Sequence, residues 1–246
     1  MCTVTWLRGV GRLELFTNRD EQRSRPPAEA PSERTSASGV RFLSPLDPAG
    51  GGTWVAASEH GLVLCLVNHY QARDPRGAAL RSRGLIVTDL IDARAPEEVL
   101  ERGASLPFDA LRGFRLLALA PDRQPALLAW DGERVETARG DAIPLPLISS
   151  SVRLPEVERS RGALFARMAE RRGAVDAALL DAFHRSEDPE PGPLSVSMTR
   201  DDASTVSHTR VVVESDEIAM HYAPGRPSER GTETVTRLTP SARGGA

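Results

Sequence analysis

Two short apolar segments joined by a tight turn constrain the fold of this chain more than any other feature. Residues 53–57 (Thr-Trp-Val-Ala-Ala) and 62–67 (Leu-Val-Leu-Cys-Leu-Val) are apolar at consecutive positions, and Glu59-His60-Gly61 lies between them. Successive side chains of a strand point to opposite faces of its sheet, so strands of this kind are buried on both faces. We therefore predict a β-hairpin in the centre of a sheet that is covered on each side.

Other periodic segments surround this hairpin. Strand patterns occur at 3–6, 12–16, 115–120, 126–130, 134–137, 205–214 and 217–222, and helical patterns at 84–93, 96–103, 155–172 and 175–184. Strands at both ends enclose a helical middle, which predicts an α+β domain of stacked sheets and flanking helices over residues 1–223. Residues 23–39 are predicted to form a surface loop, and residues 224–246, rich in Gly, Pro, Arg, Ser and Thr, a flexible C-terminal tail.

The composition excludes several classes of function. The 31 basic residues are all arginine and face 34 acidic residues, giving a net charge of −3. This balance provides no overall field for holding nucleic acid or an anionic membrane, and without lysine there is no Schiff-base chemistry. No apolar run approaches the roughly 20 residues of a membrane-spanning helix, and the first residues lack the pattern of a signal peptide. We expect a cytoplasmic protein without a membrane span.

Histidine and cysteine patterns do not indicate a metal or a cofactor. None of the five histidines has the spacing of a zinc enzyme, and all are expected to be solvated or hydrogen-bonded: His60, His69, His184, His208 and His221. Two cysteines are too few for a disulfide framework or a thiolate metal site. Phosphate-loop and dinucleotide motifs are absent from the sequence. We expect neither a metal nor a cofactor.

Cys2 is the residue with the most distinctive chemistry. Removal of Met1, which a small second residue favours, would leave Cys2 with both a thiol and a free α-amine. The amine, with a pKa of about 7.7 to 8.0, could then act as the base for a thiol of pKa about 8.5. A disordered chain end is the alternative, but the strand predicted at 3–6 would hold Cys2 in place. Cys65, within an apolar run, is expected to be a buried hydrophobic residue.

Three polar residues could support such a nucleophile. Arg19 would favour the thiolate and lower its pKa, Asp20 would hold the α-ammonium, and Asn68 would donate a hydrogen bond to a developing oxyanion. Simpler interpretations remain open: a solvated charge cluster after a strand for Arg19 and Asp20, and an ordinary strand-terminating residue for Asn68. The arginines between 159 and 172 are predicted to lie on a solvated helix face.

These motifs together resemble the NRDE family, also called the transport and Golgi organization protein 2 family. The resemblance is carried by 1–4 (Met-Cys-Thr-Val), 15–21 (Leu-Phe-Thr-Asn-Arg-Asp-Glu), 51–54, 59–62 and 68–70, with looser agreement at 82–87 and 149–151. This family is in turn similar to the N-terminal-nucleophile hydrolases, in particular the cysteine acylases that cleave bile-salt and penicillin V amides. The resemblance implies a four-layer αββα sandwich of two antiparallel sheets flanked by helices.

The same resemblance implies an activity and a set of site residues. The activity is hydrolysis of a linear amide, with a small-molecule amide or acyl-type ligand as the partner. The rival hypotheses are a non-catalytic binding or trafficking factor for haem or an acyl lipid on the same fold, and a plain interaction module. The implied catalytic residues are Cys2, Arg19, Asp20, Asn68 and, in place of a second oxyanion-stabilising asparagine, Ser150, with Arg200 or Arg210 as loose candidates for a late arginine.

Overall fold

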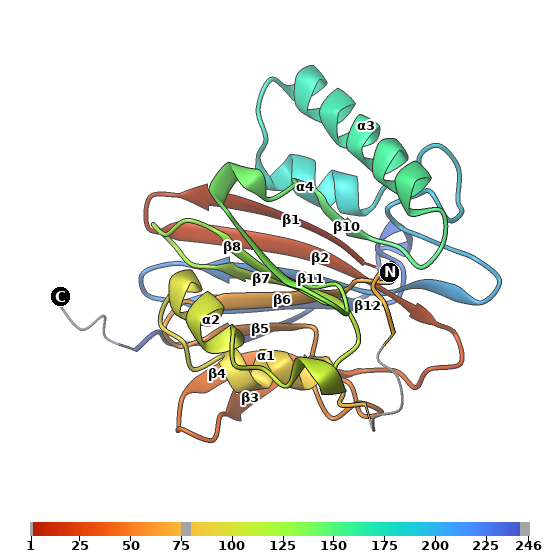
Figure 1. The fold of residues 1–246 in the computed structure, drawn as a ribbon. Helices are drawn as coiled ribbons and strands as arrows, with labels where there is room; N and C mark the ends of the chain where they lie inside the picture. Colours follow the sequence, from red (N-terminus) through yellow and green to blue (C-terminus); the bar gives the residue numbers. More distant parts are fainter. Residues whose placement is uncertain (1, 75–79, 242–246) are drawn as a thin grey trace.

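The computed structural model describes residues 2–74 and 80–241, which fold into two stacked β-sheets with helices outside them (Figure 1). Neighbouring strands are antiparallel throughout both sheets. The six-stranded sheet has the order β10-β1-β2-β11-β12-β13, with β1 (Cys2–Gly9), β2 (Arg12–Gln22), β10 (Leu147–Ser149), β11 (Ala203–Val213), β12 (Ile218–Pro224) and β13 (Thr234–Leu238). The seven-stranded sheet has the order β3 to β9, with β3 (Glu29–Thr35), β4 (Arg41–Leu46), β5 (Val55–Ser58), β6 (Val63–Asn68), β7 (Phe114–Leu119), β8 (Ala126–Trp130) and β9 (Val135–Arg139).

Two pairs of helices cover the outer faces of the sheets. Helices α1 (Gly84–Leu90) and α2 (Pro96–Gly103) pack on β5 to β8, while α4 (Ala177–His184) packs on β1 and β2 beneath α3 (Leu154–Arg172) (Figure 1). Single 3-10 turns lie at Phe108–Ala110, Gly140–Ala142 and Pro227–Glu229. The layers therefore run helix, sheet, sheet, helix, and the predicted α+β sandwich of two antiparallel sheets is confirmed.

The side chains of β2 point alternately to the two faces of the six-stranded sheet and so contribute to two different hydrophobic cores. Leu13 and Leu15 lie in the core between the sheets, whereas Phe16 belongs to the core beneath α3 and α4. A strand with both faces covered in this way buries nearly every residue.

The hairpin predicted from consecutive apolar residues is confirmed as β5 and β6, with Val55 opposite Cys65, in the middle of the seven-stranded sheet. Trp54, just before β5, is packed with 7% of its surface exposed.

Two segments differ from the sequence-based expectation. The loop expected at 23–39 contains β3, which pairs with β4, so this prediction is wrong over residues 29–35. Residues 234–238, expected in a flexible tail, form β13 on β12, and Leu238 is buried; residues 242–246 lie outside the described part. Both are edge strands held by backbone hydrogen bonds, and each has a single buried residue, Pro31 in β3 and Leu238 in β13. Such strands leave little apolar pattern to detect.

A buried polar network lies between the six-stranded sheet and α4. Asn18 Oδ1 accepts hydrogen bonds from Nδ1 of His184 (3.1 Å) and of His208 (2.8 Å), while its Nδ2 donates to the carbonyl oxygen of His184 (2.9 Å). His184 Nε2 lies 2.9 Å from the hydroxyl of Thr5 and accepts from it. An amide oxygen can only accept, so each imidazole carries a proton on Nδ1. The expectation of hydrogen-bonded histidines holds for these two.

Burial makes this network sensitive to acid. It lowers the pKa of His208 to about 4 and that of His184 well below its usual value, while Arg185 and Arg210 also disfavour protonation of His208 and Asp181 favours it. An unfolded histidine titrates near pH 6.5, so between pH 6.5 and 4 the unfolded state binds more protons than the folded state. The contribution of these histidines to the free energy of unfolding is therefore largest above pH 6.5 and decreases as the pH falls toward 4.

We expect the free energy of unfolding to fall by about 3 kcal/mol from the titration of His208 alone between pH 7 and 4. Urea unfolding at a series of pH values measures this change. The control is His208→Gln, whose side-chain amide can still donate to Asn18 but does not titrate, so its stability should vary less with pH. Identical pH profiles for the two proteins would contradict this account of the network.

Candidate active site

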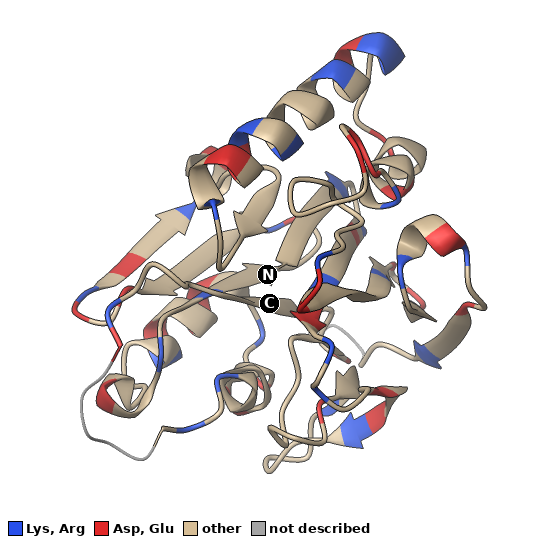
Figure 2. Cartoon of the chain, turned by 90° about the vertical axis from the view of Figure 1, so that its right-hand side faces the viewer, with Lys and Arg blue, Asp and Glu red and all other residues tan. Residues whose placement is uncertain are grey.

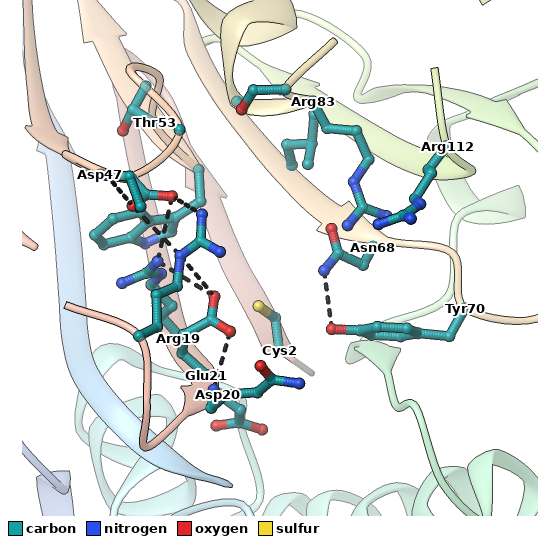
Figure 3. Close-up of a pocket in the computed structure, with 18 of the residues that line it drawn as sticks. Cys2, Arg19, Asp20, Glu21, Asp47, Thr53, Asn68, Tyr70, Arg83 and Arg112 are labelled. Atoms are coloured by element: carbon teal, nitrogen blue, oxygen red, sulfur yellow. Dashed lines mark hydrogen bonds and ion pairs between the residues drawn. The ribbon is translucent and has the colours of Figure 1, made fainter. Parts of the chain in front are cut away.

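A pocket of about 620 Å³ opens where β1, β2 and β6 meet the segment that leads into α1 (Figure 3). Its walls come from parts of the chain that are far apart in sequence. Cys2, Leu66, Asn68 and Tyr70 line it together with a set of charged residues. These are Arg19, Asp20, Glu21, Arg25, Asp47, Arg81, Arg83 and Arg112.

A close backbone contact joins two of these walls. Thr53 N donates to the carbonyl oxygen of Gly84 at 3.1 Å, and a Cβ atom on Gly52 would come within 2.3 Å of the carbonyl carbon of Gly84. Only glycine allows two backbones to pack this closely. The glycine run before β5 therefore brings the loop that carries Asp47 and Trp54 against the start of α1.

Cys2 lies at the beginning of β1, between Arg19 on β2 and Ser149 on β10. Its side chain belongs to the core between the sheets and also lines the pocket, with 8% of the residue exposed. Burial raises the pKa of the thiol, and the carboxylate of Asp20 raises it further; a backbone hydrogen bond from Asp20 and the charge of Arg19 act in the opposite direction. Arg19 thus lowers this pKa, in the direction predicted, but burial outweighs its charge and the pKa of Cys2 is raised overall.

Arg19 is held on the wall of the pocket by several partners. Its guanidinium carbon lies 4.3 Å from the centre of the Trp54 ring, and its Nη2 atom lies 3.3 Å from Glu21 and 3.7 Å from Asp47. Asp47 also forms an ion pair with Arg25. The side chain of Arg19 is 7% exposed, so it is part of a packed charge network rather than a solvated cluster. Trp54, Glu21 and Asp47 were not among the predicted site residues.

Asp20 follows Arg19 inside β2, so its carboxylate lies on the opposite face of the sheet. Its Oδ1 atom accepts a hydrogen bond of 2.6 Å from the hydroxyl of Thr205, and its Oδ2 atom lies 3.8 Å from Nη1 of Arg161. Nη1 of Arg161 also donates to the hydroxyl of Thr3, the residue after Cys2. This buried arginine links β1, which carries the thiol, to the neighbouring strand β2.

Arg161 corrects the expectation of a wholly solvated face on α3. The outer surface of α3 carries basic and acidic segments (Figure 2), and Arg159, Arg167 and Arg171 are exposed there. Arg161, in contrast, is fully buried. Arg161 lies at helical spacing from Val157, Leu164 and Phe165, the other buried residues of α3, and this spacing is the sequence signal that could have indicated its burial.

Asn68 ends β6 on the wall across from Arg19 (Figure 3). Its Nδ2 donates to the hydroxyl of Tyr70 at 2.9 Å, and its backbone oxygen accepts from the hydroxyl of Ser149. An asparagine amide carries two N–H donors, so a second one remains for a ligand. Tyr70, which was not predicted, follows Asn68 so closely in sequence that its place at the strand end could have been inferred.

The structure does not place Ser150 among the residues that line this pocket. The hydroxyl of Ser150 donates to the carbonyl oxygen of Val152 and accepts from its N–H, and Gln71 donates to the backbone oxygen of Ser150. These contacts engage the Ser150 hydroxyl in a local turn with Val152. Arg200 and Arg210 also lie outside the lining; they pair with Asp202 and Glu14. Thus Cys2, Arg19, Asp20 and Asn68 are brought together, and Ser150 is not.

Residues 2–74 and 80–241 contain no group of three or more His, Cys, Asp or Glu side chains that could hold a metal ion. In the pocket, Glu21 and Asp47 instead pair with Arg19 and Arg25. Within the same described ranges, no helix is both long and apolar enough to cross a membrane.

The exposure of the two thiols predicts a difference in reactivity. Cys2 reaches the pocket, whereas Cys65 is fully buried and its pKa is raised by burial. We expect iodoacetamide to modify Cys2 well before Cys65, because alkylation requires both access and the thiolate. The rate should rise about tenfold per pH unit while the pH stays below the pKa of Cys2. Peptide mass spectrometry over time measures both sites, and equal labelling of the folded protein would contradict this description.

A match to a protein-family model connects this site with known proteins. The family described as Transport and Golgi organisation 2 matches residues 1–145, more than half of the chain, and this range includes every residue that lines the pocket. The chain belongs to the Transport and Golgi organisation 2 family. The resemblance drawn from its N-terminal motifs is thereby confirmed. No curated protein matches the sequence.

The fold of this chain is similar to those of several solved structures. Penicillin V acylase from Agrobacterium tumefaciens matches with a TM-score of 0.59 at 11% identity, over 97% of this chain and 86% of the other. A cysteine-to-alanine mutant of conjugated bile acid hydrolase from Clostridium perfringens gives 0.56 at 11% identity, over 97% and 92%. The N-acylethanolamine-hydrolyzing acid amidase ortholog of Caenorhabditis elegans gives 0.56 at 8% identity, over 85% and 92%. At these identities the likeness establishes a common fold, that of the N-terminal-nucleophile hydrolases.

Proposed function

We propose that this chain is an amidohydrolase that uses Cys2 as its nucleophile and acts on a small-molecule amide. The observation that carries the proposal is the position of the Cys2 thiol: it lines a pocket large enough for such a ligand, with Asn68 on the wall facing it. The shared fold of a penicillin V acylase, a conjugated bile acid hydrolase and an acid amidase supports the same reaction class. These proteins are similar only in fold, so the substrate of this chain is not taken from them.

The proposed reaction begins with removal of Met1, which gives Cys2 a free α-amine. Because burial raises the pKa of the thiol, the nucleophile needs a base, and an α-amine with a pKa of about 7.7 to 8.0 is suited to that role. The amine accepts the thiol proton as sulfur attacks the amide carbonyl carbon. The resulting oxyanion receives a hydrogen bond from the amide of Asn68.

Collapse of this tetrahedral intermediate breaks the C–N bond. The leaving nitrogen takes the proton from the α-ammonium, and the acyl group remains on sulfur as a thioester. Water then attacks the thioester carbonyl and gives a proton to the α-amine, which returns it to sulfur as the carboxylic acid departs. The atoms balance as amide plus water giving amine plus acid.

The remaining residues of the proposed site position the nucleophile. Asp20 provides a backbone hydrogen bond to sulfur, and its carboxylate is fixed by Thr205 and Arg161. Arg19, packed on Trp54, holds the wall beside the thiol and limits the rise of its pKa. No step is assigned to Ser150, whose hydroxyl is engaged with Val152.

Intact-mass analysis together with an amide panel tests this proposal. We expect the purified chain to begin at Cys2 and to hydrolyse at least one member of a panel containing penicillin V, a conjugated bile acid and an N-acylethanolamine. Intact mass after rapid quenching should then include a species heavier by the acyl group. A chain that retains Met1 and cleaves no amide would contradict the proposal.

A further inference from the structure

The arginines on opposite walls of the pocket are neutralised to different extents. Beside β2, the charges of Arg19 and Arg25 are balanced by Glu21 and Asp47, with nitrogen–oxygen distances from 2.5 to 3.7 Å. The wall that carries Asn68 has a different composition. There Arg83 and Arg112 extend toward the same part of the pocket (Figure 3).

Arg83 has little compensation for its charge. Its Nη1 atom donates to the backbone oxygen of Gly113 at 2.9 Å, and within 2–74 and 80–241 it forms no ion pair with a carboxylate. Its side chain is half-buried, so solvent only partly screens this charge. Burial lowers the pKa of Arg83, the phenol of Tyr70 favours the charged form, and the nearby charge of Arg112 disfavours it.

Arg112 is compensated only weakly. Its Nε atom lies 3.5 Å from Asp74 Oδ1, and 56% of the Arg112 side chain and 79% of the Asp74 side chain are exposed. An ion pair so open to solvent contributes little, and a ligand can compete for this arginine. Two neighbouring guanidinium groups without a fixed carboxylate between them repel one another, and an anion placed between them removes that repulsion.

We propose that Arg83 and Arg112 form a subsite for an oxyanion group of the substrate, either a carboxylate or a phosphate. The fork of N–H donors in a guanidinium matches the paired oxygens of both groups. The inference rests on the proposed function in calling the ligand a substrate, and it narrows that ligand to an amide carrying a negative charge away from the scissile bond. The balanced arginines beside β2 form the opposite wall, so an anion is drawn toward Arg83 and Arg112.

Anion binding to the full chain tests this subsite without turnover. The measurement is isothermal titration of glutarate and of inorganic phosphate into the Cys2→Ser protein, and into the same protein carrying Arg83→Gln, Arg112→Gln or Arg237→Gln. Arg237 is a matched control, since it lies on β13 outside the pocket and pairs with Glu217 at 3.1 Å. We expect at least one probe to bind, with affinity about 10- to 100-fold weaker in each pocket variant and unchanged in the control.

The outcomes separate the subsite from the proposed reaction. Tighter binding of glutarate identifies a carboxylate, and tighter binding of phosphate identifies a phosphoryl group. Absence of binding by both probes, or equal binding in all variants, overturns the subsite. If Arg83→Gln fails to fold, Arg112→Gln decides alone, because its side chain is mostly exposed. Wild-type protein that cleaves no amide would refute the proposed function, while arginine-dependent anion binding would still establish the subsite.

Discussion

Replacing Cys2 by alanine is expected to lower kcat for amide hydrolysis by about 10⁴-fold or more, the largest effect of any substitution in this chain. Without the thiol no acyl-enzyme can form, and removal of a nucleophile in other hydrolases has an effect of this size. The fold should persist, because the change removes only the sulfur atom of a side chain that borders the pocket at the beginning of β1. The measurement is steady-state turnover together with intact mass after rapid quenching.

Cys65→Ala provides the matched control for this experiment. Both cysteines are free and buried in the core between the sheets, but only Cys2 reaches the pocket. The Cys65 variant should lose some stability, since it leaves a small cavity, and should keep its kcat. Full activity in Cys2→Ala would rule out the nucleophile and with it the proposed mechanism.

Asn68→Ala is expected to lower kcat by about 10²- to 10³-fold with little change in substrate binding. An oxyanion donor acts where charge develops in the transition state, so its loss slows the chemical step. Stability should fall by only about 0.5 to 1.5 kcal/mol, because the hydrogen bond that the side chain of Asn68 donates among the described residues goes to Tyr70 at the pocket wall. Turnover, ligand affinity and urea unfolding measured on the same preparation distinguish these effects.

Tyr70→Phe is the control that isolates the role of Asn68. It removes the hydroxyl that accepts from the Asn68 amide but leaves both amide N–H groups in place. We expect a change in kcat much smaller than that of Asn68→Ala. A non-catalytic carrier of haem or an acyl lipid predicts another pattern, in which Asn68→Ala and Cys2→Ser alter ligand affinity or nothing, and no amide is cleaved.

Much of the fold follows from local patterns in the sequence. Strands with both faces buried are apolar at consecutive positions, so β5 and β6 were predicted from residues 53–67 alone, and the helical period identified α2 and α3. The edge strands β3 and β13 were not predicted. They are held mainly by backbone hydrogen bonds to β4 and β12, and such bonds do not require a particular pattern of side chains.

The candidate site was also predicted in part from the sequence. The sequence by itself determined the chemistry near the N-terminus: a cysteine at position 2, Arg19 and Asp20 shortly after a predicted strand, and Asn68 at the end of another. Strand pairing brings these residues together, and it also places the side chains of Arg19 and Asp20 on opposite faces of β2. Their separate roles therefore follow from the observation that residues 19 and 20 lie within the strand rather than after it.

Only the tertiary structure decided which distant residues complete the pocket. Behind the pocket, Arg161 of α3 is buried against Asp20, a partner that is 141 positions away in the sequence. Asp47, Arg83 and Arg112 come from separate loops that meet because the sheets stack and the glycines allow close backbone contact. Pattern along a chain reflects which face of an element is buried, whereas the pairing of charges between distant loops depends on how the layers pack.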